Sequence, residues 1–424
     1  MNGIGICQNI FETINILLKG HEFKDTYCKA GTFVRNRKMS FEMMILYLLN
    51  SSKKAIPINI ADVREKLPQI SFPDVSKQAV SKARQGICPE AFAEFFRISV
   101  TAFYNSCSAL QTWNGYHVYA IDRSSLQIPQ TKRNLFEFGG AINQTDHTSA
   151  LADVSVCFDV LNDIVIDAII SSHSYGERKL AMKHLQQIEC HRFRQNSLFI
   201  FDRGYPSYNM YRELQERNVF FLMRTSSKIH TSIPDNTIFP FRPKEHDKSL
   251  PIITLRKIHV PLKDGTIETL VTNILDPSVT SEMFKELYFL RWGIEGKYKE
   301  FKGRLEIEEF TGSHPTSIMQ DFFITMFKSN MAAIIKMEAD LEIKQKRKSK
   351  KNKYEYQANR SFIINRIQEC IAKLAYALCD IRTSLESIVK NAVRNLSQIQ
   401  PDRSFSRKKK NTKRKHYNNI KSCL

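Results

Sequence analysis

The central part of the chain alternates short apolar, β-rich runs with amphipathic helical runs, and this order constrains the fold most. The β-rich runs cover residues 117–121, 151–160, 164–171, 197–201 and 219–223, and helical patterns at 177–192 and 207–217 separate the last three. This order predicts an α/β fold, with a mixed sheet and helices packed against it. In such sheets, residues just beyond the carboxyl ends of the strands face the ligand crevice.

The alternation stops at residues 226–275. Two strand-like runs at 252–260 and 266–273 flank Lys263, Asp264 and Gly265, which read as a hairpin turn. We therefore expect a β-rich insertion. The regions before and after the sheet have helical patterns. The expected organisation is a helical region at 1–112, an α/β domain made of 113–225 and 276–340, the insertion at 226–275, and a basic, mainly helical region at 341–424 with a disordered tail.

Residues 75–97 predict two short helices, broken at 86–89. With Lys77, Lys82 and Arg84 exposed, this pair fits a helix-turn-helix that reads DNA. A helical packing domain with ordinary surface cations fits the pattern equally well.

The charge balance points to a polyanionic partner. The 424 residues include 63 Lys and Arg against 43 Asp and Glu, a formal charge of +20. Blocks 341–360 and 401–424 contribute +6 and +8 of it. Such blocks also fit a solvated linker and a frayed tail. No apolar run approaches the roughly 20 residues that span a bilayer, and the N-terminus lacks the basic start of a signal peptide.

The cysteines argue for a reducing compartment. There are nine, an odd number, and none are spaced as Cys-x-x-Cys. This excludes a disulfide framework and a cysteine zinc site. Adjacent Cys190 and His191 have poor spacing for ligands, and His173 and His184 are expected at the surface or in caps.

Four polar side chains fall on one edge of the helix expected from residue 281 onward. At 100° per residue, Tyr288, Arg291, Glu295 and Lys302 lie within an arc of about 60°. One carboxylate among cations suits a site that holds a metal ion next to phosphates. A surface helix with i, i+4 ion pairs is the alternative.

Two further carboxylates follow apolar strands. Asp122 and Asp202 come directly after residues 117–121 and 197–201, where a bare carboxylate is costly unless it is paired or bound to metal. Together with Glu295 they could hold two Mg²⁺ ions for in-line displacement at phosphorus. A lone Asp at a strand end is more often a turn former or a cap. The other strand carboxylates, Asp153, Asp159, Asp163 and Asp167, are expected to be residues of the solvent-exposed face, turn formers or caps.

The spacing Tyr-x2-Arg-x3-Glu-x6-Lys, formed by Tyr288, Arg291, Glu295 and Lys302, resembles the signature of the insertion-sequence-four family of bacterial DDE transposases. Asp122 in the segment IDRSS resembles the first catalytic aspartate of that family, and Asp202 in DRGY the second. The resemblance covers about residues 115–340.

The resemblance implies an RNase H-like catalytic domain that cuts DNA at terminal inverted repeats and joins the ends to a target. It implies two Mg²⁺ ions, which Mn²⁺ can replace, bound by Asp122, Asp202 and Glu295. Tyr288, Arg291 and Lys302 would contact double-stranded DNA near the cleaved end. Trp292 would either stack on a displaced base or pack in the protein. The implied setting is the bacterial cytoplasm and nucleoid, with no membrane, a DNA-binding N-terminal region and a dimer in the synaptic complex.

Two other functions stay open at this point. A domesticated relative would hold DNA without cutting it, and another RNase H-like nuclease would cut RNA:DNA hybrids or junctions. An assay of plasmid excision separates the first from a transposase. Cleavage of inverted-repeat duplex compared with hybrid separates the second.

Deleting residues 401–424 should weaken DNA binding and flatten its salt dependence, since each phosphate neutralised contributes a slope of about −0.9. Filter binding at several salt concentrations measures this effect. Cleavage at low salt and saturating DNA should persist, and its loss would show that the basic tail takes part in the chemistry.

Overall fold

The structure is a computed structural model that describes residues 1–34, 38–142, 148–189, 196–226, 233–242, 250–262, 265–348 and 353–400. The chain divides into two compact units. Unit 1 comprises Met1–Ala109, Leu126–Ala152 and Glu300–Leu424, and unit 2 comprises Leu110–Ser125 and Asp153–Lys299. Cys190, His191, Lys263, Asp264 and the basic tail from residue 401 lie outside the described residues.

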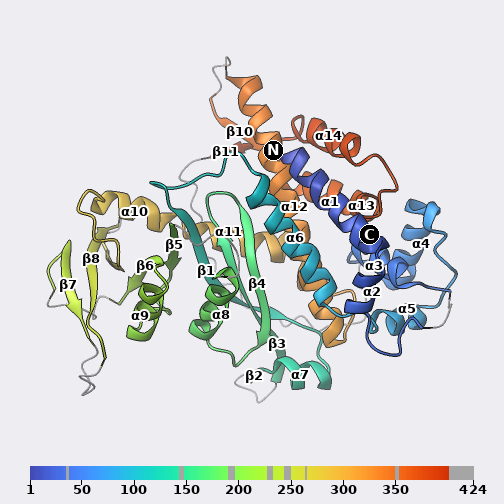
Figure 1. The fold of residues 1–424 in the computed structure, drawn as a ribbon, viewed down its shortest axis with the longest axis horizontal. Coiled ribbons are helices and arrows are strands. Elements are labelled where there is room, and N and C mark those ends of the chain that lie inside the picture. Colours follow the sequence, from blue (N-terminus) through green and yellow to red (C-terminus); the bar gives the residue numbers. More distant parts are fainter. Residues whose placement is uncertain are drawn as a thin grey trace. The chain divides into compact units, whose positions relative to one another are not determined.

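The sheet of unit 2 follows the order β4-β3-β1-β5-β6-β9-β8-β7 (Figure 1). Strands β1, β5 and β6 are parallel, whereas β9, β8 and β7 continue the sheet in antiparallel pairs. The three-residue strand β2 (Gly140–Ile142) also pairs with β3. Without it, strands β1, β3, β4, β5 and β6 lie in the spatial order β4-β3-β1-β5-β6, which is the RNase H-like arrangement expected above. The bounds are β1 (His117–Gln127), β3 (Thr148–Asp159), β4 (Ile164–Ser172), β5 (Ser197–Phe201), β6 (Phe220–Thr225), β7 (Thr237–Phe241), β8 (Ile253–Pro261) and β9 (Ile267–Thr272).

The β-rich insertion is confirmed. β8 and β9 pair as the expected hairpin, and β9 pairs with β6, so the insertion extends the main sheet. β7 was not expected from the sequence. Its five residues, TIFPF, include Pro240, which cannot donate to a ladder and suits the edge position that β7 occupies.

Apolar residues from neighbouring strands make the core of unit 2. Val118, Leu198, Ile200 and Leu222 are all completely buried, as expected for parallel strands covered on both faces. Helix α8 (Glu177–Glu189) packs against β4, α9 (Tyr208–Glu216) against β6, and α10 (Ser281–Phe289) against β8.

Unit 1 is mainly helical. Helices α1 (Gly3–Lys19), α6 (Glu90–Ser106) and α12 (Pro315–Arg347) pack on one another (Figure 1). Phe327 of α12 meets Phe11 of α1 and Phe95 of α6 at ring-centroid distances of 6.3 and 6.2 Å. The remaining elements are α2 (His21–Tyr27), α3 (Phe41–Asn50), α4 (Ile56–Lys66), a 3₁₀ helix (Pro68–Ile70), α5 (Lys77–Arg84), α7 (Lys132–Phe138), β2 (Gly140–Ile142), β10 (Glu355–Ala358), α13 (Arg360–Ala375), α14 (Ile381–Ala392) and β11 (Leu396–Ile399).

No helix among the described residues is both long enough and apolar enough to span a bilayer.

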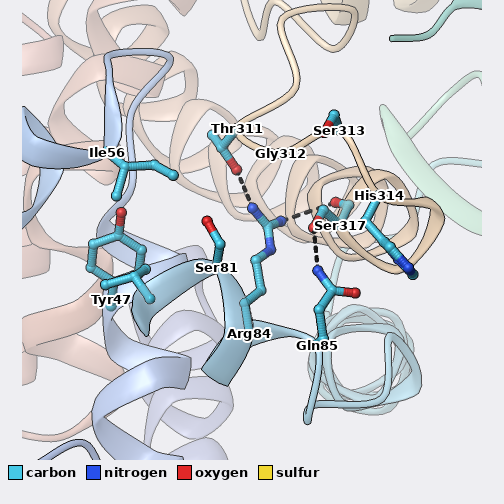
Figure 2. A pocket seen from close by; sticks show the side chains of 11 residues that line it. Tyr47, Ile56, Ser81, Arg84, Gln85, Thr311, Gly312, Ser313, His314 and Ser317 are labelled. Atoms are coloured by element: carbon cyan, nitrogen blue, oxygen red, sulfur yellow. Dashed lines mark hydrogen bonds between the residues drawn. The ribbon is translucent and has the colours of Figure 1, made fainter. Parts of the chain in front are cut away.

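The expected pair of helices at 75–97 is present as α5 and α6, but Arg84 is not exposed. Its side chain is 5% exposed and pairs with Asp321 of α12 at 2.6 Å. Figure 2 shows the guanidinium also donating to Thr311 and to the carbonyl of Ser317. Burial raises the pKa of Asp321, yet the guanidinium of Arg84 and the ammonium of Lys53 hold it below its usual range. Helical periodicity could not reveal this partner, because Asp321 is distant in sequence.

Helix α6 buries its aromatic face in unit 1, including Phe92, Phe95 and Phe103. A buried face and a buried Arg84 both favour the packing interpretation of residues 75–97 over the helix-turn-helix.

Replacing Arg84 by Ala should lower the free energy of unfolding by about 3–5 kcal/mol, because it leaves the buried Asp321 carboxylate without its main cation. Denaturant unfolding measures the change. Arg97→Ala is the control, since Arg97 is 51% exposed and pairs with Glu94 near the surface; that loss should stay below about 1 kcal/mol. Equal losses would show that the buried pair contributes nothing special.

Candidate active site

The pairing of β1 with β5 places two carboxylates side by side. The parallel register matches His117 with Ser197 and Ala120 with Ile200. Two residues further along the same register, Asp122 is level with Asp202. β5 ends at Phe201, so Asp202 follows its strand as expected, but β1 runs on to Gln127 and Asp122 lies within the strand. The expectation that β1 ends at Asp122 was therefore wrong.

The signature residues do not lie on one continuous helix. α10 ends at Phe289, α11 (Trp292–Gly303) begins at Trp292, and Arg291 lies in the turn between them. The amides of Leu290, Arg291 and Ile294 bond three residues back, so the chain tightens locally as in a 3₁₀ turn. The prediction that these four residues share one edge of a single continuous helix was therefore wrong.

Arg291 connects the signature to the aspartates. One guanidinium nitrogen lies 3.2 Å from Glu295 and another lies 3.9 Å from Asp202. The hydroxyl of Tyr288 donates to Asp202 at 3.3 Å. The Arg291 side chain is only 5% exposed, and its Nε atom has no hydrogen-bond partner among the residues that the structure describes.

Two other signature residues differ in their surroundings. Trp292 is 46% exposed, and its ring lies 5.0 Å from the Arg291 guanidinium, so its inner face covers that cation. Lys302 falls in the last turn of α11, within unit 1, where its ammonium lies 3.7 Å from Glu308.

The surroundings of Asp122 disfavour the charged form of its carboxyl. Burial raises its pKa to about 6; the Arg123 amide and the Arg291 guanidinium lower it, and the carboxylates of Asp202 and Glu177 raise it. A nearby cation would therefore be strongly favoured at this position.

The backbone of Asp122 is held from β3 and α11. The hydroxyl of Tyr298 donates to its carbonyl at 2.7 Å, and that of Ser155 does so at 3.2 Å. Tyr298 is buried, and the sequence does not predict the role of its hydroxyl, because that depends on a partner in another element.

Gly204, in the DRGY segment, is explained by close approach. A Cβ atom at this position would lie 2.5 Å from a carboxylate oxygen of Glu177. A larger residue would have to push aside the end of the Glu177 side chain, which comes from the first turn of α8.

Several carboxylates expected at the surface are buried. Asp153 and Asp159 are completely buried. Asp153 pairs with Arg123 and accepts from Ser125 at 2.8 Å. Asp159 accepts from the amides of Leu161 and Asn162, so its expected turn-forming role is confirmed. His173 lies 2.8 Å from Asp153.

In the part of the chain that the structure describes, no three His, Cys, Asp or Glu side chains are grouped closely enough to hold one metal ion. The guanidinium of Arg291 explains the separation, since it lies between Asp202 and Glu295.

An RNase H-like mixed sheet of this strand order is typical of nucleases and polynucleotidyl transferases. A family model described as "Transposase DDE domain" matches residues 113–331, more than half of the chain, and the chain belongs to this family.

A similar protein from Sinorhizobium fredii (strain NBRC 101917 / NGR234), named "Putative transposase y4zB", is 29% identical over 145 residues. The match covers 30% of this chain and 39% of that protein, so the chain spans about two fifths of that relative. A solved structure of the piggyBac transposase synaptic complex with hairpin DNA has a TM-score of 0.43 and 12% identity, covering 92% of this chain and 82% of its own.

Asp122→Asn should raise the free energy of unfolding by about 2–3 kcal/mol at pH 7.5 without divalent ions, because it removes a carboxylate whose charged form the fold disfavours. The folded pKa of Asp122, about 6, lies above its ordinary value of 3.8. The wild type therefore loses this stability as the pH rises from about 4 to 6, and the advantage of the variant should vanish near pH 4.

Denaturant unfolding at both pH values measures the effect. Glu282→Gln is the control, since that side chain is 69% exposed. A constant difference between Asp122→Asn and the wild type at both pH values would contradict the assignment of the effect to this carboxyl.

Proposed function

We propose that this protein is a DNA transposase of the insertion-sequence-four type, which binds the terminal inverted repeats of its own element and catalyses strand cleavage and strand transfer. The observation that carries the proposal is the closeness of Asp122, within β1, to Asp202, just after the parallel neighbouring strand β5, with Arg291 contacting both Asp202 and Glu295. The setting would be the bacterial cytoplasm and nucleoid, with two copies in the synaptic complex. Membership of the transposase family supports it.

Asp122, Asp202 and Glu295 would hold Mg²⁺, or Mn²⁺ in its place. The fit is supported by an oxygen-only donor set, which these hard cations prefer, and by the burial of Asp122, which raises its pKa and would favour a cation beside it. When bound, divalent ions lower the pKa of an attacking hydroxyl and stabilise the leaving oxygen. To bring the three carboxylates together, Arg291 would release Glu295.

Arg291 would then turn to DNA. Its unpartnered Nε and the released nitrogen offer the planar, paired donors that suit a phosphate. Tyr288 would keep Asp202 in place through its hydroxyl. Lys302 and the outer face of Trp292 would contact the DNA near the cleaved end.

Asp122→Asn, Asp202→Asn and Glu295→Gln should each abolish Mg²⁺-dependent cleavage of a duplex ending in the inverted repeat. The loss should exceed the roughly 100-fold that removal of an outer-shell partner costs. Binding to the same duplex should persist, because the phosphate contacts remain. A gel assay of nicked product, with a shift assay for binding, gives both quantities.

Glu282→Gln, on the exposed face of α10, is the matched control and should cleave normally. Undiminished cleavage by any of the three amide variants would remove that residue from the site. A wild-type chain that binds inverted-repeat DNA and never cuts it would instead identify a domesticated binding protein.

A further inference from the structure

A chain of hydrogen bonds leads from helix α8 to the backbone of Asp122. Nδ1 of His184 lies 2.6 Å from Asp167 of β4, and Nε2 lies 2.9 Å from the hydroxyl of Ser155 on β3. That hydroxyl donates to the carbonyl of Asp122 at 3.2 Å. The expectation that His184 is a surface or capping residue was wrong: His184 and Ser155 are both completely buried.

A serine, a histidine and an aspartate in this order resemble the layout of a hydrolase triad, but burial excludes that role. A nucleophilic hydroxyl must reach its substrate, and Ser155 has no exposed surface and points at a backbone carbonyl. The arrangement is therefore a support for Asp122.

The hydrogen atoms that these side chains carry determine which group donates in each hydrogen bond of the network. Ser155 has one hydroxyl hydrogen, and it donates this hydrogen to Asp122. Nε2 of His184 must then carry a hydrogen and donate to the serine oxygen. A second hydrogen lies between Nδ1 and Asp167, so the histidine and aspartate together are neutral. A neutral pair suits a histidine with no exposed surface, because an unbalanced charge there is costly.

Another titratable group lies on the strand that carries Ser155. Cys157 lies on the same face of β3 as Ser155, two residues further on, and burial followed by the carboxylates of Asp167 and Asp159 raises the pKa of its thiol well above its usual range. The thiol therefore stays neutral and does not compete as an anion for the hydrogen on Nε2.

We propose that Ser155, His184 and Asp167 are positioning residues that fix the catalytic strand segment at Asp122 through its carbonyl. This inference rests on the proposed function. The network and Tyr298 donate to the same carbonyl oxygen from different elements. They hold the backbone of Asp122 without using its carboxylate, of which one oxygen accepts from the Arg123 amide at 2.8 Å.

Ser155→Ala in the full chain should weaken Mg²⁺ binding and slow single-turnover cleavage by about 10- to 100-fold, as expected for an outer-shell partner. Affinity for inverted-repeat DNA should not change. His184→Leu should lose as much, whereas His184→Gln, whose amide can donate to Ser155, should stay within about threefold of the wild type. Combining Ser155→Ala with His184→Leu should add no further loss. Cys157→Ala, on the same strand face, is the control and should behave as the wild type.

Two readouts do not need cleavage. Calorimetry of Mg²⁺ binding reports the position of Asp122, and ¹⁵N NMR of histidine-labelled protein, assigned with His184→Gln, shows whether Nε2 carries a hydrogen. A protonated Nε2 with weaker Mg²⁺ binding in Ser155→Ala supports the network, even if the wild type cuts no DNA and the proposed function fails. An unprotonated Nε2, additive losses, or Mg²⁺ binding and cleavage by Ser155→Ala equal to those of Cys157→Ala would overturn it.

Discussion

The parallel pairing of β1 with β5 is the constraint on which the candidate site depends. The register that joins Ala120 to Ile200 also brings Asp122 level with Asp202. Two carboxylates at neighbouring positions repel one another, and the burial of Asp122 increases the cost. The fold accepts this arrangement because a buried guanidinium lies beside the pair, and helix α10, which precedes Arg291, packs into the apolar core of the sheet. Strand pairing, core packing and charge compensation therefore act together to keep Asp122 and Asp202 close to one another.

This charge compensation is also temporary in any metal-dependent mechanism. Arg291 lies near Asp202 and Glu295 in the positions where a divalent ion would need their oxygens. An arginine can supply this positive charge before an ion binds, since its charge is permanent and its planar donors can bind either carboxylates or phosphate. A lysine would compensate the charge but would lack the paired geometry. The cost of the carboxylates in the free protein is thus an expected feature of an active site, because sites that work are rarely at their stability optimum.

The sequence predicts the mixed sheet and the strands of the insertion, because these depend on local patterns. Short apolar, β-rich runs located β1, β5 and β6, and the end of the run at 197–201 located Asp202. The errors concern features that tertiary contacts decide. Arg84 has the pattern of a surface cation and is buried because Asp321 lies across the interface with α12. The helix expected through Arg291 tightens at that residue, and His184 is buried because Asp167 and Ser155 satisfy both of its nitrogens.

The support of Asp122 illustrates why the backbone, and not the side chain, is the place for such contacts. A hydrogen bond to the carboxylate would stabilise its charge but would also occupy an oxygen that a metal ion needs. Bonds from Tyr298 and Ser155 to the carbonyl hold the residue and leave both carboxylate oxygens out of the contact. One carboxylate oxygen does accept from the Arg123 amide at 2.8 Å, which leaves the other oxygen for the ion of the proposed site. Contacts to the carbonyl can thus fix the position of Asp122 without using the carboxylate oxygens that this proposed site needs.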